Sequence, residues 1–166
     1  MTLQVLNQVE AEQAAQLLQQ CCTSDSWIAR VLEQRPFADA DALRSAADTA
    51  WQHLDEADYL QAFEGHPKIG DVTSLKAKYA DTKQLAAGEQ ASVNSATDAV
   101  ISALAAGNTA YEKKFGFIFI VCATGKSAGE MLALLQERLS NDREQELANA
   151  AEEQRKIFHL RLEKLL

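Results

Sequence analysis

The stretch that decides the fold class is residues 89–115, EQASVNSATDAVISALAAGNTAYEKKF. Apolar or small side chains recur along it in steps of three or four, and Glu89 lies at the head of the same line. These positions are Val93, Ala96, Val100, Leu104, Gly107, Tyr111 and Phe115. Such spacing puts them on one face of an α-helix. The stretch therefore predicts a long helix with one buried face and a carboxylate at its start.

The rest of the chain has the same character. Only 7 Gly and 2 Pro occur in 166 residues, so few places favour a turn, while Ala, Leu, Glu and Gln favour helices. The further expected helices span 7–21, 27–34, 39–54, 55–64, 127–139 and 142–166, with a helical turn or two over 74–80 and an ordered loop over 81–88. Residues 115–121 are an apolar run without a partner strand, and we interpret them as a buried extended link or a helix end. The sequence predicts an all-α, single-domain bundle of seven or eight helices over residues 1–166.

Three helix starts carry a capping signal. Asn7 with Glu10 marks the first helix, Asp39 or Asp41 the third, and Ser127 with Glu130 forms a capping box for a later helix. Two aromatic features, Trp27 with Trp51 and the Phe115-Gly116-Phe117 group, are expected in the core rather than around a cofactor.

Charge and composition exclude several classes of function. The 24 acidic and 16 basic residues give a formal charge of −8 and a pI near 4.9, which disfavours binding to nucleic acid. No apolar window is long enough to cross a bilayer and the N-terminus lacks a signal-peptide pattern, so we expect no membrane partner and a cytoplasmic protein. Three cysteines without paired spacing suggest neither a disulfide framework nor a zinc site. No metal-ligand motif or phosphate loop is present, so no metal and no cofactor are expected.

The strongest chemical signal is residues 63–71, FEGHPKIGD. Pro67 disfavours a helical backbone at His66, and Gly65 offers the preceding helix a place to end, so His66 is expected on a short loop. An imidazole held there can exchange protons near neutral pH, as general acid or base catalysis requires. A single loop histidine can equally be a surface residue or a helix cap.

Two charged side chains are expected to face inward. Glu89 heads the apolar line described above, where the free N–H groups of a first turn favour a carboxylate, although it could also lie in solvent. Arg161 falls among core-facing positions of the last helix and requires an anion, either an internal carboxylate or a substrate group. Arg138, near a helix C-terminus, suits a capping or dipole role and is interpreted as structural.

Taken together, these motifs resemble one family. His66-Pro67-x-Ile69-Gly70 with Glu89-Gln90 is similar to the pattern of the 2-oxo-4-hydroxy-4-carboxy-5-ureidoimidazoline (OHCU) decarboxylases, which complete the route from urate to (S)-allantoin. The resemblance extends over nearly the whole chain, in the same order, through Trp27-Ile28-Ala29, Arg35-Pro36-Phe37, Phe115-Gly116-Phe117, Arg138-Leu139-x-Asn141, Lys156-Ile157 and Arg161-Leu162. Two local departures are Ile118, where the family often has Pro, and Ala86-Ala87-Gly88, where a polar residue before the Glu is more usual.

The resemblance implies a carboxy-lyase that decarboxylates OHCU without a cofactor and acts as a homodimer. His66 is then the proton donor and Glu89 its acid-base partner. The substrate-binding residues that it implies are Pro67, Ala86, Ala87, Gly88, Glu89, Gln90, Ile118, Phe119, Ile120, Val121, Cys122 and Arg161. An alternative remains on composition and periodicity alone: an acidic helical interaction module in which Glu89 and Arg161 pair with each other.

Overall fold

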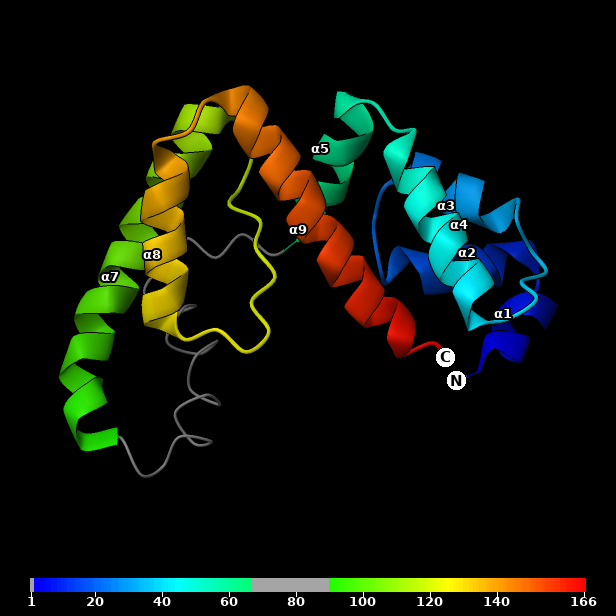
Figure 1. The fold of residues 1–166 in the computed structure, drawn as a ribbon, viewed down its shortest axis with the longest axis horizontal. Helices are drawn as coiled ribbons and strands as arrows, with labels where there is room; N and C mark the ends of the chain where they lie inside the picture. Colours follow the sequence, from blue (N-terminus) through cyan, green and yellow to red (C-terminus); the bar gives the residue numbers. More distant parts are fainter. Residues whose placement is uncertain (1, 67–89) are drawn as a thin grey trace. The chain divides into compact units, whose positions relative to one another are not determined.

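The computed structural model describes residues 2–66 and 90–166, and every regular element in this part of the chain is an α-helix (Figure 1). The helices are α1 (Leu3–Gln8), α2 (Ala11–Gln19), α3 (Asp25–Leu32), α4 (Ala40–Gln52), α5 (Glu56–Glu64), α7 (Gln90–Phe115), α8 (Ala128–Leu139) and α9 (Arg143–Glu163). For the described residues, the all-α prediction is confirmed. None of these helices is both long and apolar enough to cross a membrane.

The chain divides into two compact units. Met1–His66 and Asn149–Leu166 form one, called here the terminal unit, and the second, the central unit, lies within Pro67–Ala148. Helices α1–α5 and most of α9 belong to the terminal unit, whereas α7, α8 and the first turns of α9 belong to the central unit. That residues 1–166 make a single domain stays a prediction.

The core of the terminal unit is built around two tryptophans. The rings of Trp27 and Trp51 lie 5.0 and 5.6 Å from that of Phe158 on α9. Each indole N–H has a backbone acceptor, since Trp27 donates to the carbonyl of Ala47 and Trp51 to that of Ala151. Both tryptophans are therefore core residues, as predicted, and their polar atoms are satisfied.

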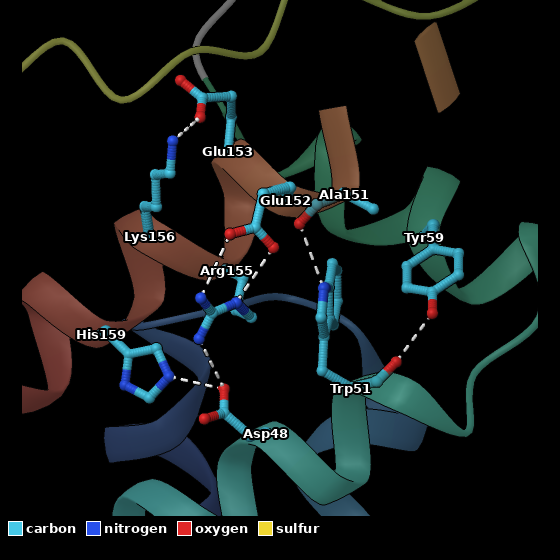
Figure 2. A network of polar contacts seen from close by, with 9 residues as sticks. All are labelled: Asp48, Trp51, Tyr59, Ala151, Glu152, Glu153, Arg155, Lys156 and His159. Carbon is cyan, nitrogen blue, oxygen red and sulfur yellow. Dashed lines mark hydrogen bonds and ion pairs between the residues drawn. The ribbon is translucent and has the colours of Figure 1, made fainter. Parts of the chain in front are cut away.

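Polar side chains of α4 and α9 also contact each other (Figure 2). Asp48 accepts hydrogen bonds from Arg155 Nη1 at 3.1 Å and from His159 Nε2 at 2.6 Å. Arg155 also contacts both carboxylate oxygens of Glu152. These contacts fix the rotation of α9 about its axis, and so determine which of its side chains face the unit's interior.

Two of the three predicted helix starts are confirmed, but the start predicted at Asn7 is wrong. Asp39 and Ser127 cap α4 and α8, their side chains accepting from Ala42 N–H and Glu130 N–H. Asn7, however, lies inside α1, and its amide makes two hydrogen bonds with the backbone of Phe37. A separate helix, α2, starts after Glu10 without a side-chain cap. The long-range partner outweighs the local capping signal at Asn7, because both ends of its amide are satisfied there.

In the central unit, α7 and α8 pack side by side (Figure 1). Gly107 makes the close approach possible, since a Cβ there would lie 2.5 Å from Cδ2 of Leu135. Helix α7 ends where Gly116 adopts a φ of +82°, a left-handed conformation that favours glycine. Residues 116–127 then connect to α8 without helix or strand, and Phe117, Ile120 and Cys122 in this connection are buried. The prediction for residues 115–121, a buried extended link or a helix end, is confirmed in part, since Phe115 ends α7 and the residues after it form neither helix nor strand, with Phe117 and Ile120 buried.

Candidate active site

His66 lies two residues after Glu64, the last residue of α5. The helix is fixed at its start by a capping box between Asp55 and Asp58 and ends at Gly65, and the N–H of His66 donates to the carbonyl of Phe63. Gly65 has a φ of −71°, so it is not a left-handed cap. It is required for space, because a Cβ there would overlap the side chain of Thr23, whose hydroxyl donates to the carbonyl of Gln61. The packing of Gly65 against Thr23 fixes the position of the backbone at His66.

The imidazole of His66 contacts helix α9. Its Nε2 forms a hydrogen bond with Oε1 of Gln154. The side chain of Gln154 is completely buried, whereas His66 is partly exposed. An amide oxygen can only accept, so the ring nitrogen that faces it carries the proton. His66 lies outside the helix, as predicted, and its ring is held by a residue that the sequence did not single out.

Arg161 lies two turns after Gln154 on the same face of α9, which corresponds to roughly 10 Å along the helix. Its Nη1 donates to the carbonyl of Cys21 at 3.4 Å. Within residues 2–66 and 90–166, no carboxylate forms an ion pair with this partly buried guanidinium. The internal salt bridge considered as an alternative therefore has no partner in that part of the chain.

The connection Ile118–Cys122 belongs to the central unit and is fixed by cationic side chains that bind its carbonyls. Arg138 Nη1 donates to the carbonyl of Ile120 at 2.6 Å, and Lys126 Nζ donates to that of Cys122 at 2.8 Å. These two hydrogen bonds restrain the path of a segment that forms neither helix nor strand. This is the segment expected to line the substrate pocket.

Arg138 also anchors a buried polar network. Its Nε lies 2.6 Å from Oε1 of Glu146, which in turn accepts from the phenol of Tyr111 at 2.7 Å. Asn141 donates to the second oxygen of Glu146 at 2.9 Å. Burial raises the pKa of the Tyr111 phenol, and its hydrogen bond to Glu146 raises it further. A fully buried glutamate is thus satisfied by three donors.

This network corrects the interpretation of Arg138. We expected a capping or dipole role at the end of α8, but the side chain is 8% exposed and forms an ion pair with a carboxylate on another helix. Its role is structural, as expected, yet it acts on the connection at Ile120 rather than on the end of α8. The sequence signal that could have found Glu146 is weak: a buried arginine requires an anion, and Glu146 is one of several acidic residues within reach.

Several predicted site residues lie outside the described part of the chain. These are Pro67, Ala86, Ala87, Gly88 and Glu89. Gln90 is the first residue of α7. Among the predicted residues, His66 and Arg161 belong to the terminal unit, and Ile118, Phe119, Ile120, Val121 and Cys122 to the central unit. Gln154 is the residue that the structure adds to His66 and Arg161.

Two further observations concern metals and thiols. Among the described residues, no group of three or more His, Cys, Asp or Glu side chains is placed to hold a metal ion. Cys21, Cys22 and Cys122 are free and buried. Burial raises the pKa of Cys21 to about 11 and that of Cys22 to about 12, so neither is a reactive thiolate.

The described residues include a histidine held after the end of α5 and an arginine on the face of α9 that contacts this histidine through Gln154. Such residues are typical of acid–base catalysis on an anionic substrate. Comparison with known proteins identifies the class. The sequence model of the OHCU decarboxylase family matches residues 7–163. The chain therefore belongs to the OHCU decarboxylase family, and the resemblance in the sequence is confirmed.

Individual relatives agree. The uric acid degradation bifunctional protein TTL of Arabidopsis thaliana is 38% identical over 146 residues, covering 87% of this chain and 45% of that protein. The chain thus spans less than half of that bifunctional relative. The OHCU decarboxylase of Halalkalicoccus jeotgali is 26% identical over 166 residues, covering 99% of this chain and 92% of the relative.

Solved structures share the fold. A crystal structure of OHCU decarboxylase in the presence of (S)-allantoin superposes with a TM-score of 0.71 at 34% identity, covering 94% of this chain and 97% of the other. The structure of (S)-allantoin synthase gives a TM-score of 0.73 at 21% identity, covering 99% of this chain and 54% of the other. The second match supports the fold alone.

Proposed function

We propose that this chain decarboxylates OHCU to (S)-allantoin and CO2 in the degradation of urate. The observation that carries the proposal is the arrangement of His66 and Arg161. The first is a histidine fixed at the end of α5 with its Nε2 against Gln154. The second is an arginine on the same face of α9, for which the described residues supply no carboxylate. One offers a proton, and the other can bind an anionic group of a substrate.

The substrate supplies the electron sink that a decarboxylation needs. In OHCU the departing carboxylate is attached next to a ring C=N. When the bond to the carboxylate breaks, its electron pair moves into the ring and the imine nitrogen is protonated, giving CO2 and an enol. The enol then loses its hydroxyl proton and gains one at the neighbouring carbon, so that one proton is taken up overall. No bound cofactor is required by this balance of electrons.

The protein then has three tasks: to hold the carboxylate, to guide protons and to choose one face of the carbon. His66 donates the proton that sets the S configuration, and Glu89 is its acid-base and orienting partner. Arg161 and Gln90 bind substrate oxygens, Pro67 shapes the wall beside His66, and the remaining lining comes from Ala86–Gly88 and Ile118–Cys122. Each of these assignments is part of the proposal.

The restraint of the Ile120 carbonyl by Arg138 supports the lining assignment. An irregular segment can present its backbone to a ligand only if it does not move away when the ligand binds. The hydrogen bonds from Arg138 and Lys126 supply that rigidity on two carbonyls of the segment.

We further propose that the protein is a cytoplasmic homodimer. The family resemblance suggests the dimer, and three free buried thiols fit a reducing compartment. Sedimentation equilibrium across a range of concentrations tests the dimer, and a mass that stays at one chain would exclude it. Fractionation of cells that express the protein tests the location.

The decisive test of the proposed activity is a coupled assay in which OHCU is generated freshly and circular dichroism follows the product. The expected result is a signal for (S)-allantoin that rises faster than spontaneous decay, with the rate proportional to protein. Dialysis against a strong chelator should leave this rate unchanged. A racemic product formed at the spontaneous rate would overturn the proposed function.

A further inference from the structure

Gln154 has one buried polar atom without a partner. Among the described residues, its Nε2 is the buried side-chain nitrogen or oxygen for which no hydrogen bond is found. The side chain is completely buried, on a helix face that otherwise carries core residues such as Phe158 and Leu162. A buried amide that uses only its oxygen is therefore held next to His66.

Such an arrangement is costly. An unsatisfied buried donor destabilises a fold, and a leucine or methionine at the same position would avoid this cost. Stability alone gives no reason for an amide here. A donor without a partner among the described residues is suited to bind a ligand, because its hydrogen bond forms without breaking one of theirs.

We propose that Gln154 is a positioning residue of the OHCU site, whose Oε1 orients His66 and whose free Nε2–H donates to an oxygen of the bound substrate. The inference rests on the proposed function, since the substrate is the one named there. It adds a residue that connects the proton donor with the substrate.

The first consequence concerns which nitrogen of His66 reacts. Because Oε1 of Gln154 accepts from Nε2–H, the ring is fixed in one tautomer and one orientation. Nε2 is then occupied throughout the reaction, so Nδ1 of the neutral ring first accepts the hydroxyl proton of the enol and then delivers a proton to the neighbouring carbon. The amide group keeps its own protons in every step.

The second consequence concerns substrate binding. OHCU presents carboxylate and carbonyl oxygens, all of which are acceptors, and Nε2–H of Gln154 is a neutral donor in a water-poor position. Arg161 lies two turns away on the same helix face and is the charged donor of the pair. Two donors roughly 10 Å apart along one face can fix the two ends of an elongated anion.

The orienting role is tested without substrate by ¹⁵N NMR of the imidazole groups. The chain has three histidines, so comparison with His66→Asn assigns the signal of His66. The expected result is a neutral ring protonated at Nε2 in the parent, with loss of that single form in Gln154→Met. A parent ring protonated at Nδ1 would overturn the inference.

The substrate role is tested by kinetics of two variants. Gln154→Met keeps the side-chain volume but removes both hydrogen bonds, and should lower kcat/KM about 10- to 100-fold by misplacing His66 and losing the donor. Gln154→Glu keeps an oxygen that can accept from His66 but removes the Nε2–H donor. The imidazole of His66 should therefore stay protonated at Nε2, while KM rises. A KM for Gln154→Glu equal to that of the parent would exclude the substrate contact.

Phe158→Leu is the matched control, one turn further along α9 and equally buried. It should lower the melting temperature without changing the tautomer of His66 or KM. If Gln154→Met behaves like this control, its role is structural and the inference fails. If the parent does not turn over OHCU at all, the proposed function fails, and the NMR result still decides whether Gln154 orients His66.

Discussion

Arg138 and Glu146 form a buried ion pair with 2.6 Å between Nε and Oε1. The glutamate is completely buried and the arginine is 8% exposed. The same guanidinium donates to the carbonyl of Ile120, so the pair joins the start of α9, the end of α8 and the middle of the connection expected to line the site. A structural network and a candidate substrate wall therefore share one side chain.

We predict that Glu146→Gln destabilises the protein by about 3 kcal/mol, because it leaves the Arg138 charge buried without its counter-ion. Chemical denaturation measures this loss. Glu152→Gln is the control, since it removes the more exposed partner of Arg155 and should cost roughly 1 kcal/mol or less. A loss for Glu146→Gln no larger than for the control would show that the buried pair is not a main support.

The double variant Arg138→Met/Glu146→Leu separates stability from the site. Apolar residues of similar volume can replace a buried ion pair at little cost, so most of the stability should return. The carbonyl of Ile120 would still lack its donor, and KM for OHCU should therefore remain raised. Full recovery of both properties would show that the restraint on Ile120 is not needed for substrate binding.

These cases show how far the sequence could predict the structure. The caps at Asp39 and Ser127 depend on residues three apart, so the local pattern was sufficient. Asn7 and Arg138 carried the same kind of local signal, but their partners are 30 residues away at Phe37 and on another helix at Glu146. A side chain with two possible partners goes to the one that buries and satisfies it better, and periodicity does not reveal which that is.

The candidate site divides in the same way. His66 was predicted because its neighbours, Gly65 and Pro67, restrict it locally. Gln154 was missed because glutamine on an apolar face has no single chemical meaning until its neighbour is known. Its partner is 88 residues away, and the contact exists only after α5 and α9 have packed in the terminal unit.

Asp48 should make stability depend on pH. Burial alone would raise the pKa of this carboxyl, but its hydrogen bonds with His159 and Arg155 outweigh burial and hold the pKa below its ordinary value. A carboxyl whose pKa is lowered in the folded state stabilises the protein at a pH above its unfolded-state pKa, about 3.9. This contribution disappears as the pH falls through the folded-state pKa. Asp48→Asn should therefore cost roughly 0.2–1 kcal/mol at pH 7 and almost nothing near pH 2.

Thermal denaturation of the parent and of Asp48→Asn from pH 7 to pH 2 measures the effect of Asp48. Asp41→Asn is the control, because Asp41 pairs with Arg44 in a much more exposed position and its loss should matter less. A difference between parent and Asp48→Asn that persists unchanged at pH 2 would contradict the assignment.

Gly65→Ala should disturb the loop that carries His66. The added Cβ would overlap Thr23, so the end of α5 or the segment before α3 must shift. We expect a loss of about 1–3 kcal/mol, as for other overpacked positions, and a fall in kcat. Gly129→Ala is the control, since a Cβ there would lie 3.9 Å from the hydroxyl of Ser127, an ordinary contact distance, and should be tolerated. Equal stability and activity in both variants would show that the loop has room to adjust.

Arg161→Lys should keep the charge and the fold but lower kcat/KM about tenfold or more, because an ammonium cannot reproduce the planar pair of donors. Arg155→Lys on the same helix is the control and should leave the kinetics unchanged. If Arg161 is purely structural, Arg161→Ala should lower the melting temperature while the activity per folded molecule stays constant. Such a result would remove Arg161 from the site.

The last prediction concerns His66 itself. His66→Asn should fold, because the residue lies beyond the end of α5, but it leaves Oε1 of Gln154 without its donor and should cost about 1 kcal/mol. Activity should fall by a factor of roughly 10²–10⁴, the usual contribution of a positioned general acid. Spontaneous decay of the substrate should then dominate and give racemic allantoin.

Glu89→Gln should cause a comparable loss, and the double variant should lose little more, because groups that act in one proton transfer are not additive. The coupled assay with circular dichroism detection measures both the rate and the enantiomer. His159→Asn is the matched control, since it removes an imidazole on α9 whose partner is Asp48, and it should retain the parent's rate and product. A His66→Asn protein that still forms (S)-allantoin near the parent's rate would show that the proton comes from another group, and His66 would then be no more than a loop residue that packs against Gln154.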